Sequence, residues 1–139
     1  MKASLISGLL LACPLIAGTG LVSCHSDDCG TTVLSSVPDP ENGHNNFSGV
    51  TAQVIARDCG AIVDRATVVR LVDYEGKGLG NGDGWVFAYG KGNPKISVEW
   101  KDAFDLVINC LGCTDEASDG SGIFLKEVKH NFINIEYAQ

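Results

Sequence analysis

The sequence is poor in positive charge, and this scarcity excludes one large class of partner. Its 139 residues hold ten lysine and arginine residues against seventeen aspartate and glutamate residues, a net charge of −7. Nucleic-acid binding needs clustered lysine and arginine to neutralise phosphates, so we expect no nucleic acid as a partner. The chain is also too short for a multidomain enzyme, because one domain commonly takes about 100–200 residues.

Motifs for catalysis and for metal binding are also missing. The three histidines, His25, His44 and His130, are too few and too scattered along the chain for a metal triad. The Gly-Ser-Gly segment at 120–122 lacks the spacing of a hydrolase nucleophile elbow. The acidic segment 115–122 fails the calcium-loop pattern, since its third position is an alanine. We therefore predict no catalytic residues, no metal site and no cofactor.

One glycine-rich segment invites a functional interpretation. Residues 76–84 hold five glycines that alternate with other residues. Glycine lets the backbone approach an anion closely, so the segment could cradle one. Its spacing matches neither the dinucleotide-binding pattern nor the Walker pattern, and no helical pattern follows it. We expect a mobile surface loop between two strands.

The first residues have the layout of an export signal. Met1 and Lys2 form a short positive region, residues 3–17 are largely apolar, and no charge follows before Asp27. Pro14 and several small residues interrupt the apolar stretch, which favours a signal peptide that is removed over a permanent membrane helix.

The end of this segment, Leu21-Val22-Ser23-Cys24, resembles the lipobox of bacterial lipoproteins. The resemblance implies that the chain is cut before Cys24 and that this cysteine carries the lipid anchor. It also implies a protein of the cell envelope that faces the periplasm. Because residue 25 is histidine rather than aspartate, the outer membrane is favoured over the inner one. The alternative is an ordinary signal peptide, with Cys24 as one more disulfide cysteine.

Four further cysteines follow, and an even number in an exported chain predicts disulfides. Four cysteines allow three pairings, of which we favour Cys29–Cys59 with Cys110–Cys113. The CxxC spacing of the second pair also allows a redox pair, and four cysteines allow a zinc site. Acidic neighbours after Cys113 disfavour a reactive thiolate, so structural disulfides are the leading interpretation.

Beyond the cysteines, the pattern is that of an all-β domain. Residues 24–46 are polar and rich in turn formers, so we expect a tether and an irregular loop, followed by one β domain over 47–139. Apolar residues then alternate with polar ones in short segments, which predicts strands. The expected strand segments cover 50–56, 65–73, 85–89, 95–101 and 104–110.

Two of these segments carry specific predictions. Trp85, Phe87 and Tyr89 are expected on one side of their strand. The short connection at 101–103 predicts a hairpin, with Phe104 at the start of its second inward-facing set.

The C-terminal residues are ambiguous between strands and a helix. A helical stripe is one alternative, but asparagine and isoleucine favour two strands with a turn near 129–131. The prediction is thus a mainly antiparallel, six- to seven-stranded curled sheet or small sandwich. Parallel pairing would need crossover helices, for which the chain has little room.

Part of this pattern resembles a group of small proteobacterial envelope proteins. The resemblance rests on Arg57-Asp58-Cys59-Gly60-Ala61, on the aromatic strand near Trp85, and on Val98-Glu99-Trp100 before 106–108. It covers roughly residues 47–110 and implies a fold and a compartment, without an activity or functional residues.

The functional hypothesis is a non-catalytic, lipid-anchored envelope module that binds a protein, such as a periplasmic immunity lipoprotein that neutralises a toxin. The acidic charge suits a basic protein partner. The binding residues and the oligomeric state do not follow from the sequence. A structural envelope lipoprotein without a dedicated partner is the first alternative, and a small hydrolase is the second.

Overall fold

The computed structural model describes residues 29–41, 49–60, 65–80, 82–92 and 94–138. Within these ranges every regular element is a β-strand, and none of the described residues belongs to a helix that could cross a membrane. The strands are β1 (Gly30–Pro38), β2 (Thr51–Asp58), β3 (Ala66–Val72), β4 (Trp85–Gly90), β5 (Lys95–Trp100), β6 (Asp105–Leu111), β7 (Gly122–Lys126), β8 (Lys129–His130) and β9 (Ile133–Ala138).

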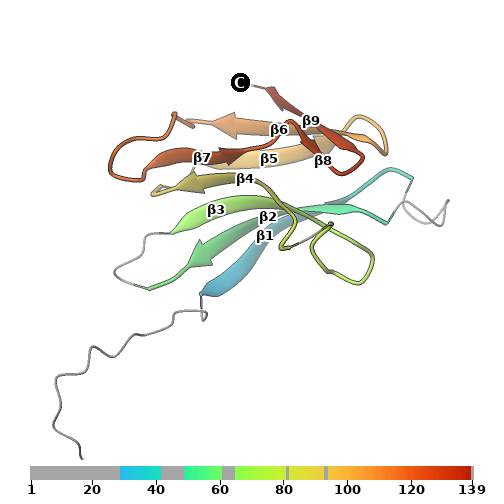
Figure 1. The fold of residues 1–139 in the computed structure, drawn as a ribbon, viewed down its shortest axis with the longest axis horizontal. Helices are drawn as coiled ribbons and strands as arrows, with labels where there is room; N and C mark the ends of the chain where they lie inside the picture. The colour runs from blue at the N-terminus through green and yellow to red at the C-terminus, as the bar shows by residue number, and fades with distance from the viewer. Residues whose placement is uncertain (1–28, 42–48, 61–64, 81, 93, 139) are drawn as a thin grey trace, which may run out of the picture.

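The strands form two sheets, which corresponds to the sandwich alternative of the prediction, with nine strands in the described residues instead of six or seven. The larger sheet has the order β1-β2-β3-β4-β7, and the smaller has the order β5-β6-β9-β8. In Figure 1 the strands β1 to β4 lie in the lower part of the view, and β5, β6, β8 and β9 lie above them. The arrowheads of β2, β4, β6 and β9 point to one end of the molecule. The all-β fold class is confirmed.

Strand β1 corrects the prediction of an irregular tether over 24–46. It pairs antiparallel with β2 from Gly30 opposite Asp58 to Pro38 opposite Thr51, with a bulge at Leu34. Its side chains lie mostly in solvent. A strand that buries so little surface shows no apolar alternation, so the polar, turn-rich sequence of this region predicts a loop instead.

One strand pair corrects the expectation that parallel pairing would need a helix. Strands β6 and β9 pair in parallel, whereas the other pairs among the named strands are antiparallel. After β6 the chain crosses to the larger sheet, forms β7 at its edge, and returns through β8 to β9. The crossover therefore runs through the opposite sheet, which replaces a helix in bringing the chain back in the same direction.

The main core lies between the two sheets. Its largest fully buried side chains include Phe87, Leu71 and Leu106. On β5, Val98 is buried and Trp100 packs against the core as the alternation predicts. Phe104 was wrongly placed inside. It is 53% exposed, because it precedes β6 in a turn.

Strand β4 also departs from simple alternation. Phe87 and Tyr89 join the main core, but Trp85 packs against a separate apolar cluster. Phe87 lies opposite Val69 and Trp85 lies opposite Arg70, so β4 has one residue more than β3 at this point. The bulge turns Trp85 to the other face of the sheet, which a strict period of two does not predict.

The two disulfides have the pairing that we favoured. Cys29–Cys59 joins the residue before β1 to the residue after β2, and Cys110–Cys113 closes the end of β6. The first therefore fixes the start of the edge strand β1 to its neighbour.

Candidate functional site

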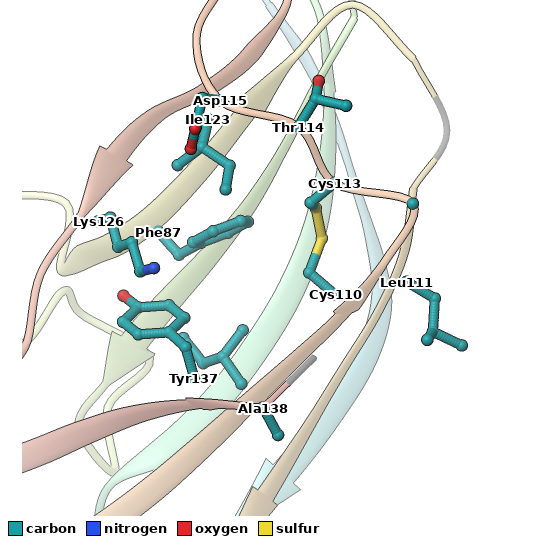
Figure 2. Close-up of a pocket in the computed structure, with 12 residues that line it drawn as sticks. Phe87, Cys110, Leu111, Cys113, Thr114, Asp115, Ile123, Lys126, Tyr137 and Ala138 are labelled. Carbon is teal, nitrogen blue, oxygen red and sulfur yellow. A yellow bond between two sulfur atoms is a disulfide. The ribbon is translucent and has the colours of Figure 1, made fainter.

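An open groove of about 640 Å³ lies between the two sheets, at the end where β6 and β9 finish. One side comes from β4 and β7 and the other from β6 and β9, and the CxxC turn forms one wall (Figure 2). The lining residues are Phe87, Ile108, Cys110, Leu111, Gly112, Cys113, Thr114, Asp115, Ile123, Lys126, Tyr137 and Ala138.

The wall is built by a tight turn after β6. Gly112 has a φ of 83°, in the left-handed region that glycine adopts without strain. This turn returns the chain so that Cys113 bonds to Cys110. Leu111, at the tip, points away from the groove and is 64% exposed.

The rim is fixed by backbone contacts with β7. The amide of Ile123 donates to the carbonyl oxygen of Thr114 at 2.9 Å, and Asp115 forms an isolated parallel bridge with Ile123. Gly122 permits this approach, because a Cβ atom there would lie 2.2 Å from the carbonyl oxygen of Asp115. The side chain of Asp115 is thereby held at the mouth of the groove (Figure 2).

The acidic loop that follows is a closed turn. The carboxylate of Asp119 accepts hydrogen bonds from the backbone amide and the hydroxyl of Ser121, and these bonds lower the pKa of Asp119. Asp115 and Glu116 are exposed, and neither forms an ion pair with a described residue. Within the described ranges, no three His, Cys, Asp or Glu side chains gather as a metal site would require.

Farther along β7, Lys126 forms a cation–π pair with Tyr137 of β9. The Lys126 ammonium lies 4.5 Å from the centroid of the Tyr137 ring. The Tyr137 hydroxyl donates to the carbonyl oxygen of Glu127 at 2.6 Å, and burial raises the pKa of this phenol far above its usual range. Lys126 forms no ion pair with a described residue. The groove thus offers an aromatic and apolar floor, one ammonium and an acidic rim.

Several residues that the sequence singled out lie away from the groove. His130 is the one histidine in the described ranges, and its ring nitrogens contact Glu127 and the carbonyl oxygen of Leu79, each at 2.7 Å. It therefore ties β8 to the glycine-rich loop instead of standing in the groove. Cys24, His25 and His44, with the expected signal segment 1–23, lie outside the described residues.

The glycine-rich segment folds back on β3. The amide of Leu79 donates to the carbonyl oxygen of Leu71 at 2.8 Å, and the amide of Lys77 donates to the Asp73 carboxylate at 2.9 Å. Because these two amides already donate to acceptors within the chain, they are not available to bind an anion. Their bonds are those expected of a structural loop.

Comparison with known proteins adds no relative. No protein-family model, no curated protein and no solved structure matches this chain. Function must therefore be argued from the groove, the surface and the sequence motifs.

Lys126 was missed as a groove residue in the sequence, and a second bulge explains why. Ala88 lies opposite Leu125 and Tyr89 lies opposite Ile123, which leaves Phe124 as an extra residue on β7. The extra residue puts Lys126, rather than Leu125, on the groove side with Ile123. Simple alternation would point the lysine to the opposite face.

Proposed function

We propose that this chain is a non-catalytic, lipid-anchored module of the cell envelope that binds a basic protein at the rim of the groove. A periplasmic immunity lipoprotein that neutralises a toxin is the specific form that we favour. The observation that carries the proposal is that exposed acids border the mouth of the groove. Asp115 and Glu116 are free of ion pairs with described residues, so a cationic partner would displace no internal ion pair of the described chain.

The anchor is proposed from the lipobox at Cys24, and the fold gives that proposal a geometric consequence. Cys29 follows Cys24 by five residues and is bonded to Cys59. Five extended residues span at most about 17 Å, so a lipid on Cys24 would hold the start of β1 near the bilayer. Two disulfides also suit an oxidising compartment, as the envelope location requires.

The groove lies at this same end of the sandwich. Strand β1 starts where the antiparallel β2 ends, and the arrowheads of β2, β4, β6 and β9 share that end in Figure 1. A partner bound at the rim would therefore meet the protein on its anchored side, close to the membrane.

The acidic rim is tested by co-purification of the tagged full chain from envelope extracts. A double variant, Asp115→Asn with Glu116→Gln, should lose a stoichiometric basic partner that the unaltered chain retains at low salt. The matched control is Asp83→Asn with Glu99→Gln, which removes the same charge from two exposed positions outside the groove. Equal capture by both double variants, or no stoichiometric partner at all, would refute the proposed interface.

The anchor is tested separately by mass spectrometry of the mature amino terminus. A diacylglyceryl group on Cys24 is expected. A chain that begins with an unmodified Cys24 thiol, or one that keeps Met1, would exclude the lipid anchor. The proposed binding of a basic partner at the groove would then be tested by the co-purification experiment alone.

A further inference from the structure

The outer face of the larger sheet carries an apolar row that crosses all five strands. Each member of the row lies opposite the next in the strand register, and the row runs from β1 to β7. It consists of Val33, Ile55, Val68, Ala88 and Leu125. Ile55, Val68 and Ala88 form a cluster separate from the main core, which places this row on the face away from the smaller sheet.

This outer row is largely covered by side chains of the same sheet. The guanidinium of Arg57 lies 5.1 Å from the ring centroid of Trp85. Trp85 packs on the outer cluster, and the exposed fractions of Val68 and Ala88 are 0%. At the β1 end of the row the side chains are less covered, since Val33 is 48% exposed. The face is therefore a largely covered platform with one open apolar end at Val33.

A second arginine belongs to the same face of the sheet. Arg70 is directly opposite Trp85 in the register, and its Nε donates to Oε1 of Gln53 at 2.9 Å. Neither Arg57 nor Arg70 forms an ion pair with any residue that the structure describes. In a chain with seventeen acidic residues, this face thus carries two arginines that have no carboxylate partner among the described residues.

We propose that this face, defined by Arg57, Arg70, Trp85 and Val33, docks an acidic segment of a partner protein. Each guanidinium has a planar set of donors that suits a carboxylate, and the Arg70 Nε is held in place by Gln53. Tryptophan and arginine are the residues that most often dominate binding energy at protein interfaces. The exposed Val33 supplies apolar contact at the open end of the row.

The geometry favours a protein segment over an anionic polysaccharide. Arg57 lies over the Trp85 ring, so that face of the indole is already taken and cannot stack a sugar. The exposed Val33 also favours a partner that carries an apolar group, which a side chain of a peptide provides. This proposal is independent of the basic partner proposed for the groove, since it concerns another face and the opposite charge.

The test is calorimetric titration of the purified full chain in detergent with a synthetic peptide of alternating glutamate and valine. The unaltered chain should bind this peptide and should not bind the same peptide with glutamine in place of glutamate. Arg57→Gln and Arg70→Gln should each weaken binding about tenfold, as expected for the loss of a charge-assisted hydrogen bond. Arg70→Lys, which keeps the positive charge but loses the planar set of guanidinium donors, should give an intermediate affinity.

The matched control is Arg65→Gln, which removes one positive charge from an arginine that is ion-paired with Asp58. It should leave the affinity unchanged, and urea unfolding should show that all variants remain folded. Equal binding of the two peptides, or no binding, overturns the proposal. Tighter binding of heparin than of the acidic peptide would assign the face to a polyanionic glycan instead. Self-association that both Arg→Gln variants abolish would assign it to a second copy of this chain.

Discussion

The indole Nε1 of Trp100 donates a hydrogen bond of 2.9 Å to the backbone carbonyl oxygen of Val37. This bond links β5 of the smaller sheet to β1 of the larger sheet. It thereby fixes the edge strand of one sheet to an edge strand of the other.

Loss of this bond should destabilise the sandwich. Trp100→Phe keeps an aromatic ring but removes the donor, so the free energy of unfolding should fall by about 1–2 kcal/mol. Urea unfolding followed by circular dichroism measures the change. Tyr74→Phe is the control, because Tyr74 is 84% exposed and should have almost no effect. A stability of Trp100→Phe equal to that of the unaltered chain would contradict the structural role of the bond.

The two disulfides should differ in their contribution to stability. Cys29–Cys59 closes a sequence separation of 30 residues, and Cys110–Cys113 closes one of three. Loop entropy predicts a loss of about 3.5–4 kcal/mol when the first is replaced by two alanines, and about 2 kcal/mol for the second. Unfolding of the two double variants in urea compares them directly. The reverse order would show that residual structure in the unfolded chain outweighs loop length.

Gly84 and Gly76 provide a matched pair in the glycine-rich loop. Both have positive φ, of 70° and 79°, so an alanine costs about 1–2 kcal/mol at either position. A Cβ at Gly84 would also lie 2.1 Å from the carbonyl oxygen of Leu71, whereas a Cβ at Gly76 would meet no described atom within 4 Å beyond its chain neighbours. Gly84→Ala should therefore cost about 3 kcal/mol or more by thermal or urea unfolding. Equal losses at the two positions would mean that the loop moves away from β3 without cost.

Stability should fall in acid as native carboxylates become protonated. Hydrogen bonds from the amides of Phe104 and Asp105 lower the pKa of Asp102 in the folded chain. A pKa that is lower in the folded state adds stability above the unfolded value of 3.8, and that stability is lost as the pH falls through the folded value. Asp102→Asn should weaken the decline of the urea midpoint below about pH 4. An unchanged decline would contradict this role of the hairpin turn.

The fold class was predictable because most strands bury one face or both. Strands β2, β3 and β5 combine β-prone residues with clear apolar patterning, and each lies where the sequence predicts it. The C-terminal region also forms strands with a turn at 131–132, close to the predicted position.

The groove and the outer platform were not predictable, because both depend on bulges. β4 has one extra residue beside Trp85, and β7 has one at Phe124. Each extra residue moves the side chains that adjoin it to the opposite face of the sheet. They bring Trp85 to the outer cluster and Lys126 to the groove. A bulge depends on how two distant strands pair, so the alternation within one strand contains no signal for it. The exposed β1 was missed for a related reason, since its stability comes from its partner strand.

The route of the chain after β6 has a kinetic consequence. Residues 133–138 complete the smaller sheet, yet they follow residues 122–126, which join the edge of the larger one. Neither layer is complete without the C-terminal third of the chain, so the two halves depend on the same late residues. Contacts between residues that are distant in the sequence slow folding. We therefore expect a chain that becomes available from its N-terminus onward to reach its native packing only after β9 is available.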